Sequence, residues 1–298
     1  MSGPPLIVVH QMAKVGSLAW VEAARSAAGR GGSEPLHAHY LTETNLAAFE
    51  AILAAKGAAN TILHPLVARL IPRNGRKAAG EIAAARARGQ PVKVITGMRD
   101  PVARSLSVAG FLADFCGRAG GALSARDGAD AAAVVAFVGD LWEAVLADAE
   151  PAGSFERLAW RMVGAYRTWF DEELAAVFGL DLLAARLPPG APWPAGGGAR
   201  RLSAAGVELL AYRAEDMGDG APGRPALLAA GAAFLETPGV ALPALNTAAT
   251  RRSWPLYAET RARFRLPAAQ LAAIYAAPAV RAFYAPEEIA GFKARWSA

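Results

Sequence analysis

The chain has 298 residues, of which 54% are hydrophobic, and it carries a formal net charge of +5, one cysteine and four histidines. This length suits one large domain, or one domain with an appended lobe, and the composition can fill a sizeable core. A single cysteine excludes an intramolecular disulfide, which suits a reducing compartment. The first residues lack the regions of a signal peptide, so we expect a cytoplasmic protein.

The basic surplus favours an anionic ligand, although a composition rich in alanine and arginine would produce the same charge. No run of arginines is interleaved with aromatic residues, so we expect no nucleic-acid partner. The longest apolar stretch, residues 129–149, is interrupted by Asp140 and Glu143. It therefore predicts an amphipathic helix, and no stable membrane insertion is expected.

The expected secondary structure alternates between strands and helices. In chain order the elements are a strand at 6–10, a helix at 17–28, a short strand at 35–40, a helix at 42–56, a strand at 60–64, a helix at 76–88, a strand at 92–98, a helix at 103–115, mostly helix over 129–178, a loop at 188–198 and a strand at 207–212. Aromatic and charged residues alternate over 254–296, which predicts short packed helices.

This alternation predicts an α/β fold, a P-loop-like parallel sheet flanked by helices on both faces. We expect a single domain over residues 1–298, with a helical C-terminal lobe from about residue 223. Ligands of such sheets bind beyond the carboxyl ends of the strands, so we expect a binding site in the loops that follow the strands.

The loop after the first strand, within HQMAKVGSLAW (residues 10–20), has the composition of an anion-binding turn. The N-terminus of a helix offers N–H groups and a partial positive charge. Gly16 would let an anion approach the backbone, Ser17 could cap the helix, and the ammonium of Lys14 could reach the anion. The loop departs from GxxxxGK[ST], and no clear acidic residue ends a neighbouring strand to hold Mg²⁺. An ordinary turn would explain the same residues.

A second stretch, RDPVARSLS, follows the strand VKVITGM. Arg99 stands at the end of that strand, and Pro101 is suited to the first turn of a helix. Ser107 then falls about two turns along this helix. Arg99 and Ser107 could hold one phosphate together, whereas a surface pair of Arg99 with Asp100 and an ordinary helix serine would be the structural alternative.

Together the two stretches resemble the sulfotransferase superfamily that uses 3′-phosphoadenosine 5′-phosphosulfate (PAPS). The resemblance implies that the first loop binds the 5′-phosphosulfate, and that Arg99 and Ser107 bind the 3′-phosphate, without a metal. The loop residues implied in cofactor binding are Lys14, Val15, Gly16, Ser17 and Leu18. The implied product is 3′-phosphoadenosine 5′-phosphate (PAP).

Further patches resemble the bacterial family of putative capsular polysaccharide synthesis proteins. They are HQMAKVGS, HAH, WFDEELAAVFGLD and AIYAAPAVRAFYAPEEIAGFKARW, and they run in order as far as Trp296. The family name describes a pathway and says little about the acceptor, for which we expect a carbohydrate or another hydroxyl-bearing compound. Many relatives carry a second hydroxyl residue after the loop serine, where this chain has Leu18 and then Ala19.

Sulfuryl transfer to a hydroxyl needs a base, and the ordinary pKa of histidine suits that role at neutral pH. His37 and His39 lie two residues apart, so on a strand they would face the same side. A similar His-x-His pair in the heparan sulfate 2-O-sulfotransferases contributes the base. That resemblance implies His39 as the catalytic base here, with His37 beside it and Lys14 stabilising the leaving group. His10 and His64 are expected to be structural.

Other polar residues have weaker claims to a site. Glu215 and Asp216 follow a predicted strand and could contact the acceptor, and Arg251 and Arg252 could add to the 3′-phosphate site. Two other functions stay open at this point. One is a P-loop-like nucleotide phosphotransferase, and the other is a protein that binds PAP or PAPS without catalysis on a degenerate sulfotransferase fold.

Overall fold

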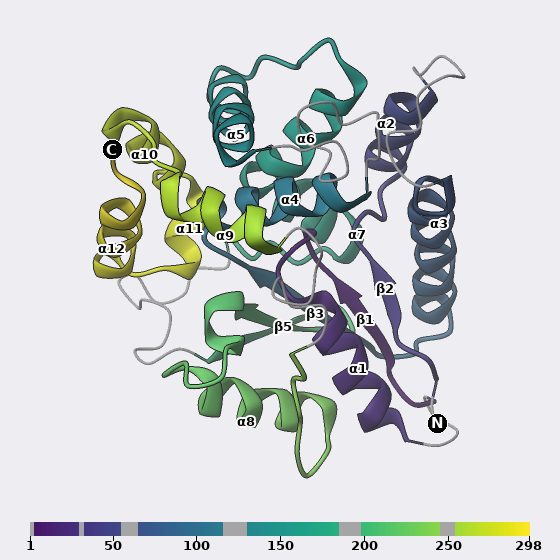
Figure 1. Ribbon diagram of the computed structural model, residues 1–298. Coiled ribbons are helices and arrows are strands. Elements are labelled where there is room, and N and C mark those ends of the chain that lie inside the picture. The colour runs from purple at the N-terminus through teal and green to yellow at the C-terminus, as the bar shows by residue number, and fades with distance from the viewer. Residues whose placement is uncertain (1–2, 30–32, 55–64, 116–129, 185–197, 245–253) are drawn as a thin grey trace. The chain divides into compact units, whose positions relative to one another are not determined.

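The computed structural model describes residues 3–29, 33–54, 65–115, 130–184, 198–244 and 254–298 (Figure 1). The chain divides into two compact units whose segments alternate along the sequence. The sheet unit comprises residues 1–46, 73–99 and 168–245, and the helical unit comprises residues 47–72, 100–167 and 246–298. The expected strand at 60–64, most of the expected loop at 188–198, and Arg251 and Arg252 lie outside the described residues.

A five-stranded sheet forms the centre of the sheet unit, in the strand order β2-β1-β3-β5-β4. The strands are β1 (Leu6–His10), β2 (Leu36–Ala38), β3 (Val92–Met98), β4 (Ala199–Ala204) and β5 (Val207–Arg213). All neighbours pair in parallel except β4, which pairs antiparallel with β5. The predicted α/β class, with a mostly parallel sheet flanked by helices, is confirmed. The edge strand β4 was not predicted, because its polar sequence ARRLSA lacks the apolar run of a buried strand.

Two helices, α1 (Ser17–Ala28) and α8 (Arg224–Leu235), pack on one face of this sheet (Figure 1). Trp20 of α1 and Phe234 of α8 are fully buried in one hydrophobic cluster with residues of β1, β3 and β5. Burying side chains of this size is the main stabilising contribution to such a layer. This face therefore fixes the start of α1 relative to the end of β1.

The other elements of the sheet unit lie between β2 and β3, or within residues 168–245, between two segments of the helical unit. They are the first turn of α2 (Glu43–Ala54), the part of α3 (Pro65–Ala87) that begins at Arg73, the π-helical turn η3 (Phe170–Ala175), α7 (Ala176–Phe178) and the 3-10 turn η4 (Ala214–Met217). The aromatic rings of Trp169 and Phe178 pack against His10, the last residue of β1. Segments from three distant parts of the sequence therefore meet around the end of β1.

The helical unit contains the rest of α2, the start of α3 up to Pro72, and eight further elements: α4 (Pro101–Phe115), α5 (Ala131–Leu146), α6 (Ser154–Gly164), η2 (Ala165–Arg167), α9 (Trp254–Arg263), α10 (Ala268–Tyr275), α11 (Pro278–Phe283) and α12 (Pro286–Trp296). Its buried carboxylate, Asp100, accepts hydrogen bonds from the Tyr275 hydroxyl (2.6 Å) and from Nε1 of Trp296 (2.8 Å). The predicted helical tail is confirmed. Helix α8, which the predicted lobe from residue 223 would include, belongs instead to the sheet unit. A single domain over the whole chain stays a prediction.

None of the described helices is long and apolar enough to cross a membrane.

Candidate functional site

The sheet has one topological switch point, between β1 and β3. The chain leaves β1 for β2 on one side and later returns to β3 on the other side. At such a point the connections diverge, and open α/β sheets bind their ligands there, beyond the carboxyl ends of the strands. The predicted anion loop follows β1, and Arg99 follows β3, so both predicted cofactor elements of the sheet unit lie at this switch point.

The loop between β1 and α1 has a strained backbone. Lys14 has a φ of 72°, an uncommon value for a residue with a side chain, and Gly16 has a φ of 97°. Gly16 is the N-cap of α1, and no side chain caps the helix. Ser17 is therefore the first helical residue, and the prediction that Ser17 caps the helix is wrong, because Gly16 occupies the non-helical cap position. A Cβ at Gly16 would lie 2.6 Å from Sδ of Met217, so a larger residue would clash with that side chain.

Side chains from three strand ends hold the carbonyl groups of this loop. Nδ1 of His39 donates to the Gln11 carbonyl oxygen (2.8 Å), and Nη1 of Arg99 donates to the Lys14 carbonyl oxygen (3.3 Å). The Tyr212 hydroxyl of β5 lies 2.8 Å from the Val15 carbonyl oxygen. A loop whose carbonyl groups are bound to the protein in this way can direct N–H groups toward an anion, as backbone nests do.

The same hydroxyl lies 2.6 Å from the side-chain amide of Gln11. The single proton of this hydroxyl is directed at two acceptors, Oε1 of Gln11 and the Val15 carbonyl oxygen, which lie at the two ends of the loop. Tyr212 thereby fixes both ends of the loop, although sequence reasoning had assigned it no role.

Arg99 is half-buried at the end of β3, and in the part of the chain that the structure describes no carboxylate pairs with it. The alternative of an Arg99–Asp100 surface pair does not hold, because Asp100 is buried and accepts from Tyr275 and Trp296. The guanidinium keeps its positive charge beside the loop. Such a group suits a phosphate, which it can bind through two parallel hydrogen bonds.

The other predicted loop residues differ in exposure. Val15 is fully buried, so only its backbone can face a ligand, whereas the Leu18 side chain is 42% exposed on the first turn of α1. Ser17 is nearly buried. Ser107 lies on α4 in the helical unit and is half-buried, and its predicted pairing with Arg99 stays a prediction.

His39 follows β2 and is held in one tautomer. Its Nδ1 must carry a proton to donate to the Gln11 carbonyl, so Nε2 carries the lone pair of the neutral ring. Burial lowers the pKa of His39, the bond to Gln11 opposes this shift, and the charge of Lys14 lowers the pKa further. At neutral pH the side chain is therefore an unprotonated imidazole beside the loop, which is the form that a general base requires.

His37 lies against His39, with ring centroids 4.9 Å apart in an edge-to-face arrangement. The structure thus brings the predicted histidine pair together. Burial, with a smaller contribution from His39, lowers the pKa of His37 to about 3, and its Nε2 is buried without a hydrogen-bond partner among the described residues. His37 is therefore a neutral neighbour of His39 at pH 7.

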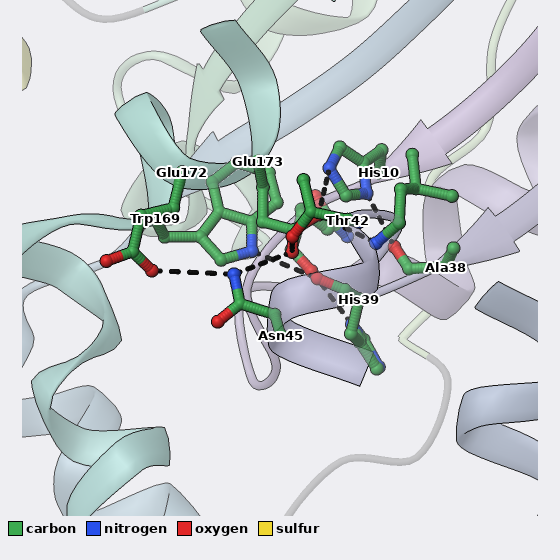
Figure 2. A network of polar contacts seen from close by, with 10 residues as sticks. His10, Ala38, His39, Thr42, Asn45, Trp169, Glu172 and Glu173 are labelled. Carbon is green, nitrogen blue, oxygen red and sulfur yellow. Dashed lines mark hydrogen bonds and ion pairs between the residues drawn. The ribbon is translucent and has the colours of Figure 1, made fainter. Parts of the chain in front are cut away.

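Two residues that sequence reasoning left without a role, Trp169 and Glu173, hold the segment that carries His39 (Figure 2). Nε1 of Trp169 donates to the His39 carbonyl oxygen (3.0 Å), and the buried carboxylate of Glu173 accepts from the backbone N–H of Leu41 (2.7 Å). The signal that could have identified them is a carboxylate at helical spacing from two aromatic residues, Trp169 and Phe170, which predicts an acid on a buried face.

Of the two remaining acidic candidates, Asp216 is engaged in contacts within the protein. Asp216 is buried and accepts two hydrogen bonds from the Arg213 guanidinium, from Nε (2.9 Å) and Nη2 (3.1 Å). It also accepts from the backbone N–H of Gly198 (3.3 Å). Since its oxygen atoms are already engaged, Asp216 is poorly placed to bind an acceptor. Glu215 lies beside it in η4, half-buried.

Comparison of this chain with protein-family models, with curated proteins and with solved structures gave no match.

Proposed function

We propose that this chain is a sulfotransferase that moves a sulfuryl group from PAPS to a hydroxyl of a carbohydrate acceptor. The observation that carries the proposal is the hydrogen bond from His39 Nδ1 to the Gln11 carbonyl. It joins a neutral imidazole to the start of a loop that has a lysine, a left-handed glycine and an uncapped helix N-terminus. This reaction needs a base and an anion-binding site, and here both lie beyond the carboxyl ends of neighbouring strands.

The chemistry of the donor groups fits the phosphosulfate and phosphate groups of PAPS. The N-terminus of α1 and the ammonium of Lys14 both favour a negative charge. Arg99 adds a guanidinium without a carboxylate partner in the described part of the chain. We assign Lys14 and residues 15–18 to the phosphosulfate, and Arg99 with Ser107 to the 3′-phosphate, as the resemblance to sulfotransferases implies.

In the proposed reaction, Nε2 of His39 takes the proton of the acceptor hydroxyl while the oxygen attacks sulfur. A new oxygen–sulfur bond forms, and the bond from sulfur to the bridging phosphate oxygen breaks. The electron pair of that bond stays on the phosphate of PAP, where the Lys14 ammonium stabilises the added charge. The proton rests on His39 and leaves to solvent. We further propose that the enzyme is cytoplasmic, because a single cysteine suits that compartment.

The test is transfer of radiolabelled sulfate from PAPS to a panel of nucleotide sugars and oligosaccharides, in a buffer with a metal chelator. We expect labelled product with wild-type protein and a loss of about 10²–10⁴-fold with His39→Ala. Phosphoryl transfer from ATP that requires Mg²⁺ would favour the phosphotransferase alternative. Tight binding of PAP with neither transfer nor hydrolysis of PAPS would favour the non-catalytic alternative.

A further inference from the structure

The backbone pairing that holds His37 does not extend to His39. The last residue of β2 is Ala38, which lies opposite His10 in the register of β1. The carbonyl oxygen of Ala38 accepts from Nδ1 of His10 (3.1 Å) and, at 3.4 Å, from the backbone N–H of Gln11. His39 is therefore the first residue beyond the strand, and its position depends on contacts other than the sheet ladder.

Trp169 supplies the first of these contacts. Its indole Nε1 donates to the His39 carbonyl oxygen at 3.0 Å, and the side chain is only 2% exposed. The ring also packs on His10, with centroids 4.6 Å apart. Because a buried aromatic ring has few alternative positions, this hydrogen bond fixes the backbone of His39 relative to the end of β1.

Glu173 holds the residues that follow. Its fully buried carboxylate accepts from the backbone N–H groups of Leu41 (2.7 Å) and Thr42 (3.2 Å). The Thr42 hydroxyl (2.7 Å) and Nδ2 of Asn45 (2.8 Å) donate to the other oxygen. A buried carboxylate is costly unless donors surround it, and here the donors come from the start of α2.

Both side chains belong to one short segment, which consists of an irregular turn and the residue before it. Trp169 precedes the π-helical turn η3 (Phe170–Ala175), which contains Glu173. Short π-helical turns are rare and often occur at functional sites, where the wider turn changes the direction of side chains. In Figure 2 the labelled side chains of Trp169, Glu172 and Glu173 reach from this turn toward His39, Thr42 and Asn45.

We infer that Trp169 and Glu173 are positioning residues that hold residues 39–42 so that His39 keeps its Nδ1–H directed at the Gln11 carbonyl. The expected effect on catalysis rests on the proposed function, whereas the expected effect on the tautomer of His39 does not. If the segment moves, the bond to Gln11 weakens, and His39 can adopt the other neutral tautomer, in which Nε2 carries the proton. In that form the ring nitrogen intended for the acceptor is already protonated and cannot act as a base.

The variants are chosen to change one contact each. Trp169→Phe keeps an aromatic ring against His10 but removes the hydrogen bond to His39. Glu173→Gln keeps the shape of the side chain but places an amide among N–H donors, so at least one of them loses its acceptor. Trp142→Phe is the matched control for the first variant, because Trp142 is fully buried in the helical unit, where Nε1 donates to Oγ of Ser105 (3.1 Å). Asp171→Asn, an exposed carboxylate two residues before Glu173, is the control for the second.

The readout is the tautomer of His39 in protein labelled with ¹⁵N-histidine, from long-range ¹H–¹⁵N correlation spectra. The chain has four histidines, and His39→Gln identifies the signals of His39. We expect the Nδ1–H tautomer alone in the wild type and in both controls at pH 7. In Trp169→Phe and Glu173→Gln we expect a mixture with the Nε2–H tautomer. Trp142→Phe removes the same kind of hydrogen bond elsewhere in the protein. If a general loss of stability changed the tautomer of His39, this control would show the change as well.

The kinetic expectation follows from the tautomer. With PAPS and an acceptor, Trp169→Phe should lower kcat about tenfold, the effect of one hydrogen bond, and Glu173→Gln up to about 10²-fold. The Kd of PAP should rise by no more than about twofold, because the two residues act on the loop only through the bond between His39 and Gln11. An unchanged His39 tautomer in both variants would overturn the inference even if the protein transfers sulfate. A changed tautomer in a protein that transfers no sulfate would keep the inference and contradict the proposed function.

Discussion

His39 and Gln11 are 28 residues apart in sequence, and Nδ1 of one lies 2.8 Å from the carbonyl oxygen of the other. The contact joins the segment after β2 to the loop after β1. It fixes the tautomer of the imidazole and, at the same time, one carbonyl group of the loop. The proposed base and the proposed anion site are thus parts of one hydrogen-bonded structure.

Replacing His39 should remove catalysis and weaken cofactor binding only slightly, through the lost bond to the Gln11 carbonyl. His39→Ala removes the base, for which a loss of about 10²–10⁴-fold in kcat is typical, whereas Lys14 and Arg99 still hold the nucleotide. His37→Ala should be milder, because His37 only packs against His39. Initial rates of label transfer and the Kd of PAP measure the two effects. Wild-type turnover of His39→Ala with an inactive His37→Ala would show that His37 is the base.

The pH profile of turnover should show a base with a low pKa. Burial first, and then the Lys14 charge, lower the pKa of His39, while the bond to Gln11 opposes them. The neutral form is the active one, so kcat rises with pH through this pKa, and the rise should lie at lower pH than for a histidine with its ordinary pKa. Lys14→Gln removes the nearby positive charge and should move the rise to higher pH. A rise of the wild-type rate centred above pH 7 would contradict the lowered pKa.

Gly16 should be irreplaceable for nucleotide binding. Gly16→Ala places a Cβ 2.6 Å from Sδ of Met217 and requires alanine to adopt a φ of 97°. Gly16 is the N-cap of α1, directly before the helix N-terminus that is proposed to bind the ligand. Gly179→Ala is the matched control, because Gly179 also has a left-handed φ of 70° but nothing within 4 Å of the added Cβ. Both variants should lose about 1–2 kcal/mol of stability in urea unfolding. Gly16→Ala alone should weaken PAP; equal Kd values in the two variants would refute a role of Gly16 at the ligand.

Arg99→Ala should weaken two interactions, one that affects every adenine nucleotide and one that affects only nucleotides with a 3′-phosphate. Loss of the bond to the Lys14 carbonyl (3.3 Å) loosens the loop and should weaken every adenine nucleotide slightly. Loss of a charge-assisted bond to the 3′-phosphate should cost PAP a further 1.5–3 kcal/mol, roughly 10–10²-fold in Kd. Calorimetry with PAP and with adenosine 5′-phosphosulfate, which has no 3′-phosphate, distinguishes the two. Equal losses for both ligands would confine Arg99 to holding the loop.

The parts of the molecule that could be predicted from the sequence are those with a strong local pattern. The buried strands β1, β3 and β5 are short apolar runs between turn residues, and α1 ends at a glycine. The strand β4 was missed because its two arginines and its serine are typical of a loop, and only pairing with β5 makes it a strand.

The candidate site was predicted in part. Lys14, Gly16, Arg99 and His39 each follow a strand, so the rule for parallel sheets could identify them, whereas His37 lies within β2. Trp169 and Glu173 could not be assigned a role, because the residues they hold lie more than 120 positions away in sequence. The helical spacing of Glu173 from two aromatic residues predicts only that the acid is buried, whereas the residues it contacts depend on the fold.

The central claim is that the loop of Lys14 and Gly16, together with Arg99, binds the nucleotide of PAPS. The most direct test is isothermal titration calorimetry with PAP and with ATP, in a buffer that contains EDTA. The account predicts a saturable one-to-one isotherm for PAP, with a Kd about tenfold or more below that of ATP, because a single charge-assisted hydrogen bond to the 3′-phosphate accounts for that ratio. No measurable binding of PAP, or equal Kd values for PAP and ATP, would contradict it.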